Sequence, residues 1–331
     1  MRRLLLLVLS VVTAAVVGTV AIACGDDGSG GDDELTIVLD WFPNPDHAGL
    51  YAAIAAGDFA EQGLEVNTQV PSDPSAALKQ VGAGRAELAI SYQPTILQAR
   101  DEGIPVVATG AIVGQPLNSI IARDDRDISR PRDLEGKTVG WPGIPINRPF
   151  LDTAVRADGG DPSKVELRSV GFGLTPALAS GRVDAIVGAY WNIELVELEE
   201  RDIAASDFRL EDFGVPNYDE LVVVASEKVL DENPDVVRRF LAGLAAGQER
   251  AAEDPEFATE AVLEANPDLE EKVTAEQVDI TAPLLTQEGQ EPLALDPAAW
   301  AEFASWMQDN DLLGDVDVDA AVTDEYLPTG T

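Results

Sequence analysis

With 331 residues, 45% of them hydrophobic, the chain is long enough to bury a core and to form two domains. Its 60 acidic and 22 basic residues give a formal net charge of -38 at pH 7, and so acidic a surface excludes nucleic acid as a partner. One cysteine excludes an internal disulfide, and one histidine leaves little for a zinc, copper or iron site, so we expect neither a metal nor a cofactor.

The N-terminal residues have the pattern of a secretory signal. Two arginines precede an apolar run over residues 4–20, and small residues follow up to Cys24. With the Gly-Asp-Asp after it, this segment resembles a bacterial lipobox, which implies a diacylated cysteine. We expect a signal peptide over residues 1–23, a lipidated tether over 24–34, and a lipid-anchored protein on the extracytoplasmic face of the cell membrane. The alternatives are a buried structural cysteine or an uncleaved anchor, because about 20 apolar residues can span a bilayer.

Alternating strand and helix patterns begin at Leu35. Strand patterns occupy residues 35–39, 64–69, 88–91 and 106–111, and helical patterns lie between them at residues 49–56, 75–83 and 94–102. This βαβ alternation predicts an α/β fold with a parallel sheet covered on both faces.

A second series of the same kind follows. Its strand patterns occupy residues 138–141, 165–169 and 185–188, and its helical patterns lie near residues 146–157, 176–180 and 193–202. The stretches that begin at Gly84 and Gly181 share a glycine, a basic and an acidic residue, and then a buried strand, 97 residues apart (181 minus 84). That spacing is too long for a solenoid repeat and predicts two related lobes.

The pattern changes after Glu220. One strand pattern at residues 221–225 is followed by helical patterns at residues 235–252, 255–265, 274–285 and 297–308. A helical tail most simply covers the first lobe, so the chain would cross between lobes twice, near residues 112–122 and 210–220. Two crossings make a hinge. We therefore expect lobe 1 to comprise residues 35–115 and 221–331, and lobe 2 to comprise residues 116–220.

The loops after the strands are the expected place for a ligand, because ligands of open α/β sheets bind beyond the carboxyl ends of the strands. These loops contain Trp41, Trp141 and Trp191, three of the five tryptophans of the chain. Aromatic side chains at one sheet edge predict stacking surfaces for a flat ligand. The tryptophan at 191 is favoured because Asn192 and Glu194 follow it, although each aromatic residue taken singly also fits a half-buried packing role.

Four segments carry a family resemblance. Residues 39–44 read LDWFPN, residues 47–51 HAGLY, residues 141–145 WPGIP and residues 190–194 YWNIE. Over about residues 35–245 the chain resembles the substrate-binding proteins of ABC importers for thiamine pyrimidine precursors, in a broader family that includes riboflavin, nitrate, sulfonate and taurine binders and a fungal pyrimidine synthase. The resemblance implies a type II periplasmic-binding-protein fold, with a hydroxymethylpyrimidine or formylaminopyrimidine held between the lobes and delivered to an ABC permease and its ATPase.

The resemblance and the loop positions together predict the ligand-binding residues. These are Asp40, Trp41, Asn44, His47, Tyr92, Gly143, Phe172, Tyr190, Trp191, Asn192 and Glu194. A 4-aminopyrimidine presents an amine beside a ring nitrogen, so a carboxylate such as Glu194 can accept from the amine while aromatic rings stack on the pyrimidine. Glu194 also fits a simple helix first turn. For His47, a loop-orienting role and a purely structural role fit the sequence equally well.

An enzyme is the competing class, because the fungal synthase shares this fold. Its chemistry needs a lysine and a histidine where this chain has Ser91 and Thr95, and a cysteine-rich motif where it has residues 216–220, so we expect no catalytic residue. Among binders, a flavin is the second candidate ligand. A nitrate or sulfonate is the third, since the loops offer little positive charge beyond Arg148. A sensor lipoprotein is the remaining alternative, and we expect a monomer.

Overall fold

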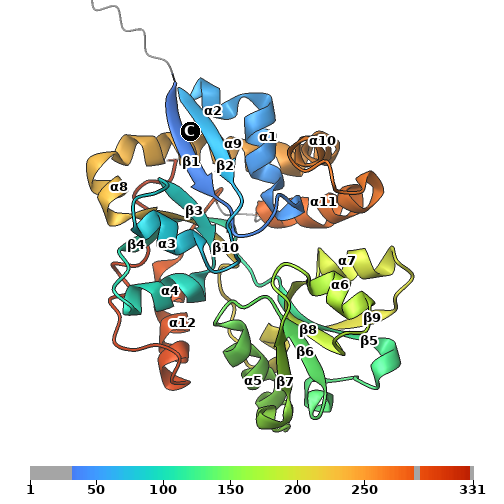
Figure 1. The fold of residues 1–331 in the computed structure, drawn as a ribbon. Helices are drawn as coiled ribbons and strands as arrows, with labels where there is room; N and C mark the ends of the chain where they lie inside the picture. The colour runs from blue at the N-terminus through green and yellow to red at the C-terminus, as the bar shows by residue number, and fades with distance from the viewer. Residues whose placement is uncertain (1–31, 287–290, 329–331) are drawn as a thin grey trace, which may run out of the picture. The chain divides into compact units, whose positions relative to one another are not determined.

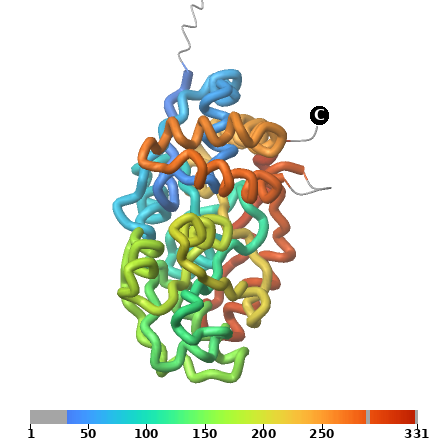
Figure 2. The backbone as a smooth tube through the Cα atoms, turned by 90° about the vertical axis from the view of Figure 1, so that its right-hand side faces the viewer, coloured from blue at the N-terminus to red at the C-terminus, as the bar shows by residue number. Residues whose placement is uncertain are grey.

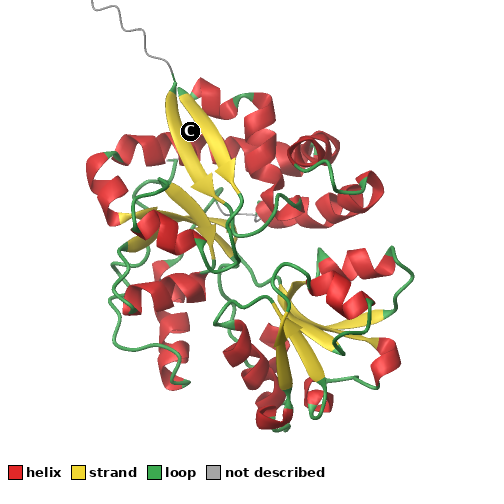
Figure 3. Ribbon diagram, viewed as in Figure 1, coloured by secondary structure: helices red, strands yellow, loops and turns green. Residues whose placement is uncertain are grey.

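Two five-stranded sheets with helices on their faces make up the described residues, 32–286 and 291–328, of the computed structural model (Figure 1, Figure 3). The predicted signal peptide, Cys24 and residues 24–31 of the predicted tether lie outside the described residues. Within the described ranges, no helix is long and apolar enough to cross a membrane.

The first sheet has the strand order β2-β1-β3-β10-β4. Its strands are β1 (Asp33–Val38), β2 (Leu64–Gln69), β3 (Leu88–Ser91), β4 (Val106–Val113) and β10 (Leu221–Ser226). Strand β1 pairs in parallel with β2 and β3, whereas β10 is antiparallel to both of its neighbours. We refer to this sheet and the helices on it as lobe 1.

The second sheet repeats this arrangement in the order β7-β6-β8-β5-β9 and forms lobe 2. Its strands are β5 (Asn118–Arg123), β6 (Thr138–Trp141), β7 (Glu166–Ser169), β8 (Ala185–Tyr190) and β9 (Ala205–Arg209). Strand β6 is parallel to β7 and β8, and β5 is antiparallel to β8 and β9.

The strands of the βαβ units pair in parallel, as predicted, and each sheet also contains one antiparallel strand for which no direction was predicted. Both of these strands, β5 and β10, are entered directly from the other lobe, through residues 114–117 and 214–220. A strand entered in this way starts at the edge that faces the other lobe, whereas its parallel neighbours end there. The two predicted crossings are confirmed, whereas β5 and β9 are not among the predicted strands, because β5 overlaps the first predicted crossing and β9 directly precedes the second.

Helices cover both sheets. Lobe 1 carries α1 (Ala48–Ala56), α2 (Asp58–Glu61), α3 (Ala77–Gly82), α4 (Gln93–Asp101), α8 (Glu227–Glu232), α9 (Pro234–Glu253), α10 (Pro255–Ala265), α11 (Glu271–Leu285) and α12 (Pro297–Asp309). Lobe 2 carries α5 (Asn147–Ala157), α6 (Leu174–Ala179) and α7 (Glu194–Glu199). Short 3-10 helices lie at Pro45–His47 (η1), Asp124–Arg126, Pro131–Leu134, Pro162–Lys164 and Leu210–Phe213.

The C-terminal helices return to lobe 1, as the sequence predicted. Helix α9 buries Val237, Phe240 and Leu244, a helical spacing, and packs on α1. The two helices cross closely at Gly247, where a Cβ atom would collide with the Gly49 carbonyl oxygen, so only glycine fits. Figure 2 shows the orange helices α10 and α11 beside the blue N-terminal segment that they cover.

Candidate functional site

A cavity of about 370 Å³ lies between the carboxyl ends of the strands of the two lobes. The residues that line it are Asp40, Trp41, Phe42, Pro43, Asn44, Asp46, Tyr92, Pro94, Asn118, Ile144, Ile146, Asn147, Phe150, Phe172, Thr175, Pro176, Gly188, Tyr190, Ile193, Glu194, Glu197, Arg201, Tyr218, Glu220, Asn266, Asp268 and Leu269. Seven of the eleven predicted site residues are therefore brought together here: Asp40, Trp41, Asn44, Tyr92, Phe172, Tyr190 and Glu194.

Lobe 1 contributes a hydrogen-bonded network centred on Asp40. The His47 Nε2 lies 2.8 Å from Asp40 Oδ1, and the Tyr92 hydroxyl donates to Asp40 Oδ2 at 2.9 Å. The Asn44 backbone N–H donates to His47 Nδ1 at 3.3 Å, so Nε2 carries the imidazole proton and donates to the carboxylate. Burial, followed by the charge of Asp40, raises the pKa of Tyr92 well above its usual value, which keeps this hydroxyl a donor. The orientation of Asp40 is thus fixed from both sides.

Aromatic rings from the two lobes meet at the cavity. The Phe172 ring of lobe 2 contacts Trp41 edge-on, at a centroid distance of 4.6 Å and an interplanar angle of 76°. It also contacts Phe42, which is 45% exposed, at 4.7 Å. Contacts of this kind join the lobes through apolar surface, so these rings both bound the cavity and hold its walls together.

Glu194 is the predicted carboxylate and lies in the first turn of α7. Its Oε2 accepts a hydrogen bond from the Tyr190 backbone N–H at 2.7 Å, and the side chain is buried. Burial, followed by the negative charge of Glu197, raises the pKa of Glu194 to about 8. Burial therefore favours the neutral carboxylic acid, which has one O–H donor and one carbonyl acceptor.

Glu220 joins the cavity to the two crossing segments and was not predicted. Its Oε2 accepts from the backbone N–H groups of Leu117 and Asn118, at 2.8 and 2.9 Å, and from the Tyr218 hydroxyl at 2.8 Å. Its Oε1 accepts from the Tyr190 hydroxyl at 3.2 Å. Burial raises the pKa of Glu220 to about 7 in spite of these four donors. One side chain thus ties the first crossing, the second crossing and the floor of lobe 2 together.

Four predicted residues lie outside the cavity lining, and each of them has contacts or a backbone role elsewhere in the protein. The Trp191 ring is covered by the Arg209 guanidinium, 3.9 Å from the ring centroid, and its N–H donates to the Pro116 carbonyl oxygen, so in this structure the ring packs on Arg209. His47 is buried behind Asp40 and orients it. Gly143 supplies a positive φ of 100° in the loop before α5. Asn192 bonds to lobe 1 instead of facing the cavity.

Asn44 lines the cavity, but its amide is used within its own loop. Its Oδ1 accepts from the Asp46 backbone N–H at 2.8 Å, and its Nδ2 donates to the Phe42 carbonyl oxygen at 3.1 Å. This arrangement caps η1. The predicted extra ligand contact from Asn44 is therefore a loop-shaping contact in the structure.

Several residues that line the cavity are not among the predicted site residues. Asn147 starts α5, so the rule that helix N-termini point toward the ligand could have identified it. Asn118 lies in the unpredicted strand β5. Asn266, Asp268 and Leu269 lie between α10 and α11, far from any strand edge in sequence, and only the packing of the C-terminal helices brings them here.

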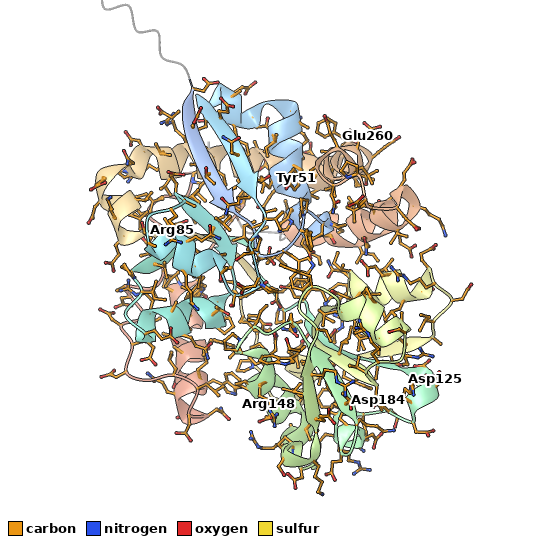
Figure 4. The ribbon with its side chains drawn as sticks, viewed as in Figure 1. Tyr51, Arg85, Asp125, Arg148, Asp184 and Glu260 are labelled. Carbon is orange, nitrogen blue, oxygen red and sulfur yellow. The ribbon has the colours of Figure 1, made fainter. Side chains whose placement is uncertain are left out.

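The charge of the lining disfavours an anionic ligand. Six acidic residues, Asp40, Asp46, Glu194, Glu197, Glu220 and Asp268, line the cavity, and Arg201 is the single basic residue among the described lining residues. Arg148, labelled on lobe 2 in Figure 4, is outside the lining and donates to Asp152 at 2.7 Å. In the part of the chain that the structure describes, no group of three or more His, Cys, Asp or Glu residues is placed to hold a metal ion.

Comparisons with known proteins agree with this architecture. The chain is 38% identical over 290 residues to a formylaminopyrimidine-binding protein of Halalkalibacterium halodurans, covering 85% of this chain and 88% of that protein. It is 33% identical over 282 residues to a putative thiamine biosynthesis protein of Haemophilus influenzae, with the same two coverages. A 4-amino-5-hydroxymethyl-2-methylpyrimidine phosphate synthase of Legionella pneumophila is 26% identical, over 71% of this chain and 74% of the synthase.

Solved structures share the fold at lower identity. The alkanesulfonate-binding protein SsuA of Xanthomonas axonopodis pv. citri superposes with a TM-score of 0.70 at 15% identity, covering 88% of this chain and 98% of that one. A Candida albicans protein with the generic periplasmic binding protein fold also gives a TM-score of 0.70, at 15% identity, with coverages of 90% and 98%. Residues 44–258 match the family model described as NMT1/THI5 like. With a match over most of its length, and with these relatives, the chain belongs to the NMT1/THI5-like family.

Proposed function

We propose that this protein is the extracytoplasmic solute-binding protein of an ABC importer, and that it captures an aminopyrimidine precursor of thiamine between its lobes. The observation that carries the proposal is the buried Glu194 in a cavity walled by Trp41, Phe172 and Tyr190. The relative at 38% identity is a formylaminopyrimidine-binding protein, which supports the same ligand class.

The chemistry of Glu194 suits a 4-aminopyrimidine. The ligand presents an N–H donor beside a ring-nitrogen acceptor, and a protonated Glu194 presents an O–H donor beside a carbonyl acceptor, so the two groups form a cyclic pair of hydrogen bonds. If the proton moves to the ring nitrogen, the same pair becomes charge-assisted and stronger. Either state recognises the amine and the adjacent nitrogen together.

The size and charge of the cavity rank the candidate ligands. Small-molecule pockets span about 300–1,000 Å³, and a cavity of about 370 Å³ is at the low end of that range. It suits a single heteroaromatic ring better than the three fused rings of a flavin. The acidic lining disfavours nitrate and sulfonates, which need positive charge.

Binding without chemistry fits the residues better than synthase activity. The synthase relatives are 24–26% identical, below the two relatives at 33% and 38%. The end of β3 and the start of α4 carry Ser91 and Thr95, which can neither hold pyridoxal phosphate as a lysine does nor take the role of the synthase histidine. The proposed cycle is therefore capture, lobe closure, docking on the permease and release of an unaltered ligand.

The proposed location depends on Cys24, outside the described residues. A lipid on Cys24 would hold the acidic protein at the membrane, because anionic headgroups repel it and lipid chains do not. Expression of the full chain should place it in the membrane fraction as a monomer, and Cys24→Ser should release it. Retention in the membrane of Cys24→Ser protein from which residues 1–23 have been cleaved would contradict the proposed anchor.

Isothermal titration with 4-amino-5-hydroxymethyl-2-methylpyrimidine tests the ligand class. We expect Glu194→Ala to weaken binding about 10- to 100-fold, because it removes both hydrogen bonds of the pair, and a bond in the charge-assisted state contributes about 1.5–3 kcal/mol. Glu199→Ala, at an exposed acidic position of α7 outside the cavity lining, is the matched control and should retain most of the affinity. Tighter binding of riboflavin, nitrate or an alkanesulfonate by the wild-type protein would overturn the proposal.

A further inference from the structure

Asn192, at the end of the loop that precedes Glu194, fastens lobe 2 to lobe 1. Its Nδ2 donates to Asp46 Oδ1 at 2.6 Å and to Thr281 Oγ1 at 2.8 Å, and the next residue accepts at its carbonyl oxygen from Gln277 Nε2 at 3.0 Å. The side chains of Asp46, Asn192, Thr281 and Gln277 are all buried. These contacts lie away from the two crossing segments, so they form only while the two lobes are together.

Two buried oxygen atoms of this cluster are left without a partner. Asp46 Oδ2 and Asn192 Oδ1 make no hydrogen bond within the described residues, although both are inaccessible to water. Two acceptors cannot satisfy each other, and an unsatisfied buried acceptor is destabilising. A proton on Asp46 Oδ2 turns it into a donor toward Asn192 Oδ1. The acid and the amide are planar and already joined by one hydrogen bond, so a second one between these two oxygen atoms would close a ring of two.

We propose that Asp46 and Asn192 are positioning residues that form a carboxylic acid–amide pair across the cleft, so that lobe closure takes up a proton on Asp46. The pair holds the loop that carries Glu194 against lobe 1. This inference concerns the closure of the protein alone and does not depend on which ligand it binds.

The surroundings of Asp46 favour its protonated form. Burial raises the pKa of Asp46 to about 7, with Asp40 also raising it and with the Asn192 hydrogen bond and His47 lowering it. From lobe 2, the facing titratable groups are Glu194 and Tyr190. Helices α1, α10 and α11 also pack on η1, but α1 has no charged residue, and the charged residues of the other two are exposed on their outer faces.

The pair gives closure a pH dependence of known sign. In an open form that exposes Asp46 to water, its pKa would be near the ordinary value of 3.8, against about 7 in the closed form. As the pH falls from about 7 to about 4, protonation of Asp46 therefore raises the ratio of closed to open protein up to tenfold for each pH unit. Above pH 7, Asp46 makes no pH-dependent contribution to this ratio. Glu194 and Glu220 also have raised pKa values, so the diagnostic quantity is the difference between variants.

Spin-label distances measure this equilibrium in the full chain without added ligand. Nitroxides on Glu65→Cys in lobe 1 and Glu166→Cys in lobe 2, both exposed positions, report the separation of the lobes. The Cys24→Ser background removes the single native cysteine. Pulsed electron–electron double resonance at pH values from 4.5 to 8.5 gives the closed fraction. Thermal unfolding verifies that each variant is folded.

Three variants separate the pair from a merely structural contact. Asp46→Asn retains a two-bond amide pair, so it should close but lose up to one unit of slope in log(closed/open) against pH. Thr281→Val removes the other bond of Asn192 and should lower the closed fraction with the wild-type slope. Asn192→Ala removes the contact across the cleft and should lower the closed fraction. A wild-type slope in Asp46→Asn, wild-type closure in Asn192→Ala, or a wild-type protein that never closes would each overturn the proposal.

Discussion

Asp40 in the lobe 1 wall is held by side chains of its own lobe, whereas the Phe172 ring in the lobe 2 wall packs on rings of lobe 1. Asp40 is fixed by His47 and Tyr92, both from its own lobe. In lobe 2, Phe172 has its ring contacts with Trp41 and Phe42 across the cleft. The lobe 1 wall is therefore pre-organised, and the lobe 2 wall is completed by closure, which favours a ligand that settles on lobe 1 first.

The largest expected effect tests the rigidity of the lobe 1 wall. Asp40→Ala leaves the His47 N–H and the Tyr92 hydroxyl without an acceptor in a buried site. We expect the free energy of unfolding to fall by about 1–3 kcal/mol for each of these donors, measured by urea denaturation. Glu194→Ala in lobe 2 is the control and should change it much less. Equal losses in both variants would remove the difference between the walls.

The pH dependence of stability tests the groups at the cleft and the hinge. Burial raises the pKa of Glu194 to about 8 and that of Glu220 to about 7, above the ordinary value of 4.5. Raised values of this kind give stability that is full below about pH 4.5 and is lost as the pH rises through 7 and 8. The opposite contribution comes from acids with lowered pKa values, such as Asp158 beside Arg130, and is lost only at more acidic pH.

We therefore expect the melting temperature to be higher at pH 5 than at pH 8. Glu194→Gln removes one titrating group at nearly constant shape, so its melting temperature should decline less over this range. A melting temperature that rises from pH 5 to pH 8 would show that these carboxyl groups are solvated in solution and that the lobe 2 wall is open.

A smaller effect concerns the aromatic contact between the lobes. Phe172→Ala removes both ring pairs with lobe 1, and each pair is worth about 0.5–1.5 kcal/mol. We expect ligand dissociation to accelerate about 5- to 100-fold in stopped-flow fluorescence, with little change in association. Phe42→Ala removes one pair and should have the smaller effect. If Phe42→Ala accelerates ligand dissociation more than Phe172→Ala does, the contacts of the Phe172 ring are not what holds the lobes closed.

The smallest expected effect is at Trp191. Its ring is covered by Arg209 and its N–H is bonded to Pro116, so Trp191→Phe should change ligand affinity less than twofold in isothermal titration. A tenfold loss of ligand affinity would mean that the Trp191 ring turns into the cavity when ligand binds. The lobe 2 wall would then include this ring as well as Phe172 and Tyr190.

Local patterns explain which elements could be predicted. The strands at residues 64–69, 88–91 and 138–141 match β2, β3 and β6, and the helix at residues 255–265 matches α10, because each combines a periodic apolar pattern with a clear start or stop. Strands β5 and β9 were missed. Residues 118–123 include a buried apolar run, but their place between the lobes had been read as a connection.

Periodicity and the side chains that follow strands are enough to predict the α/β class, the two lobes, the aromatic loops and a carboxyl group at Glu194. The tertiary structure decided which side of each loop faces the cavity: it turned Trp191 toward Arg209, joined Asn192 to Asp46, and brought Glu220 and the loop between α10 and α11 to the same site. The physical reason is that a side chain's direction depends on partners distant in the chain. The raised pKa of Glu194 depends on burial for the same reason, which no local pattern reports.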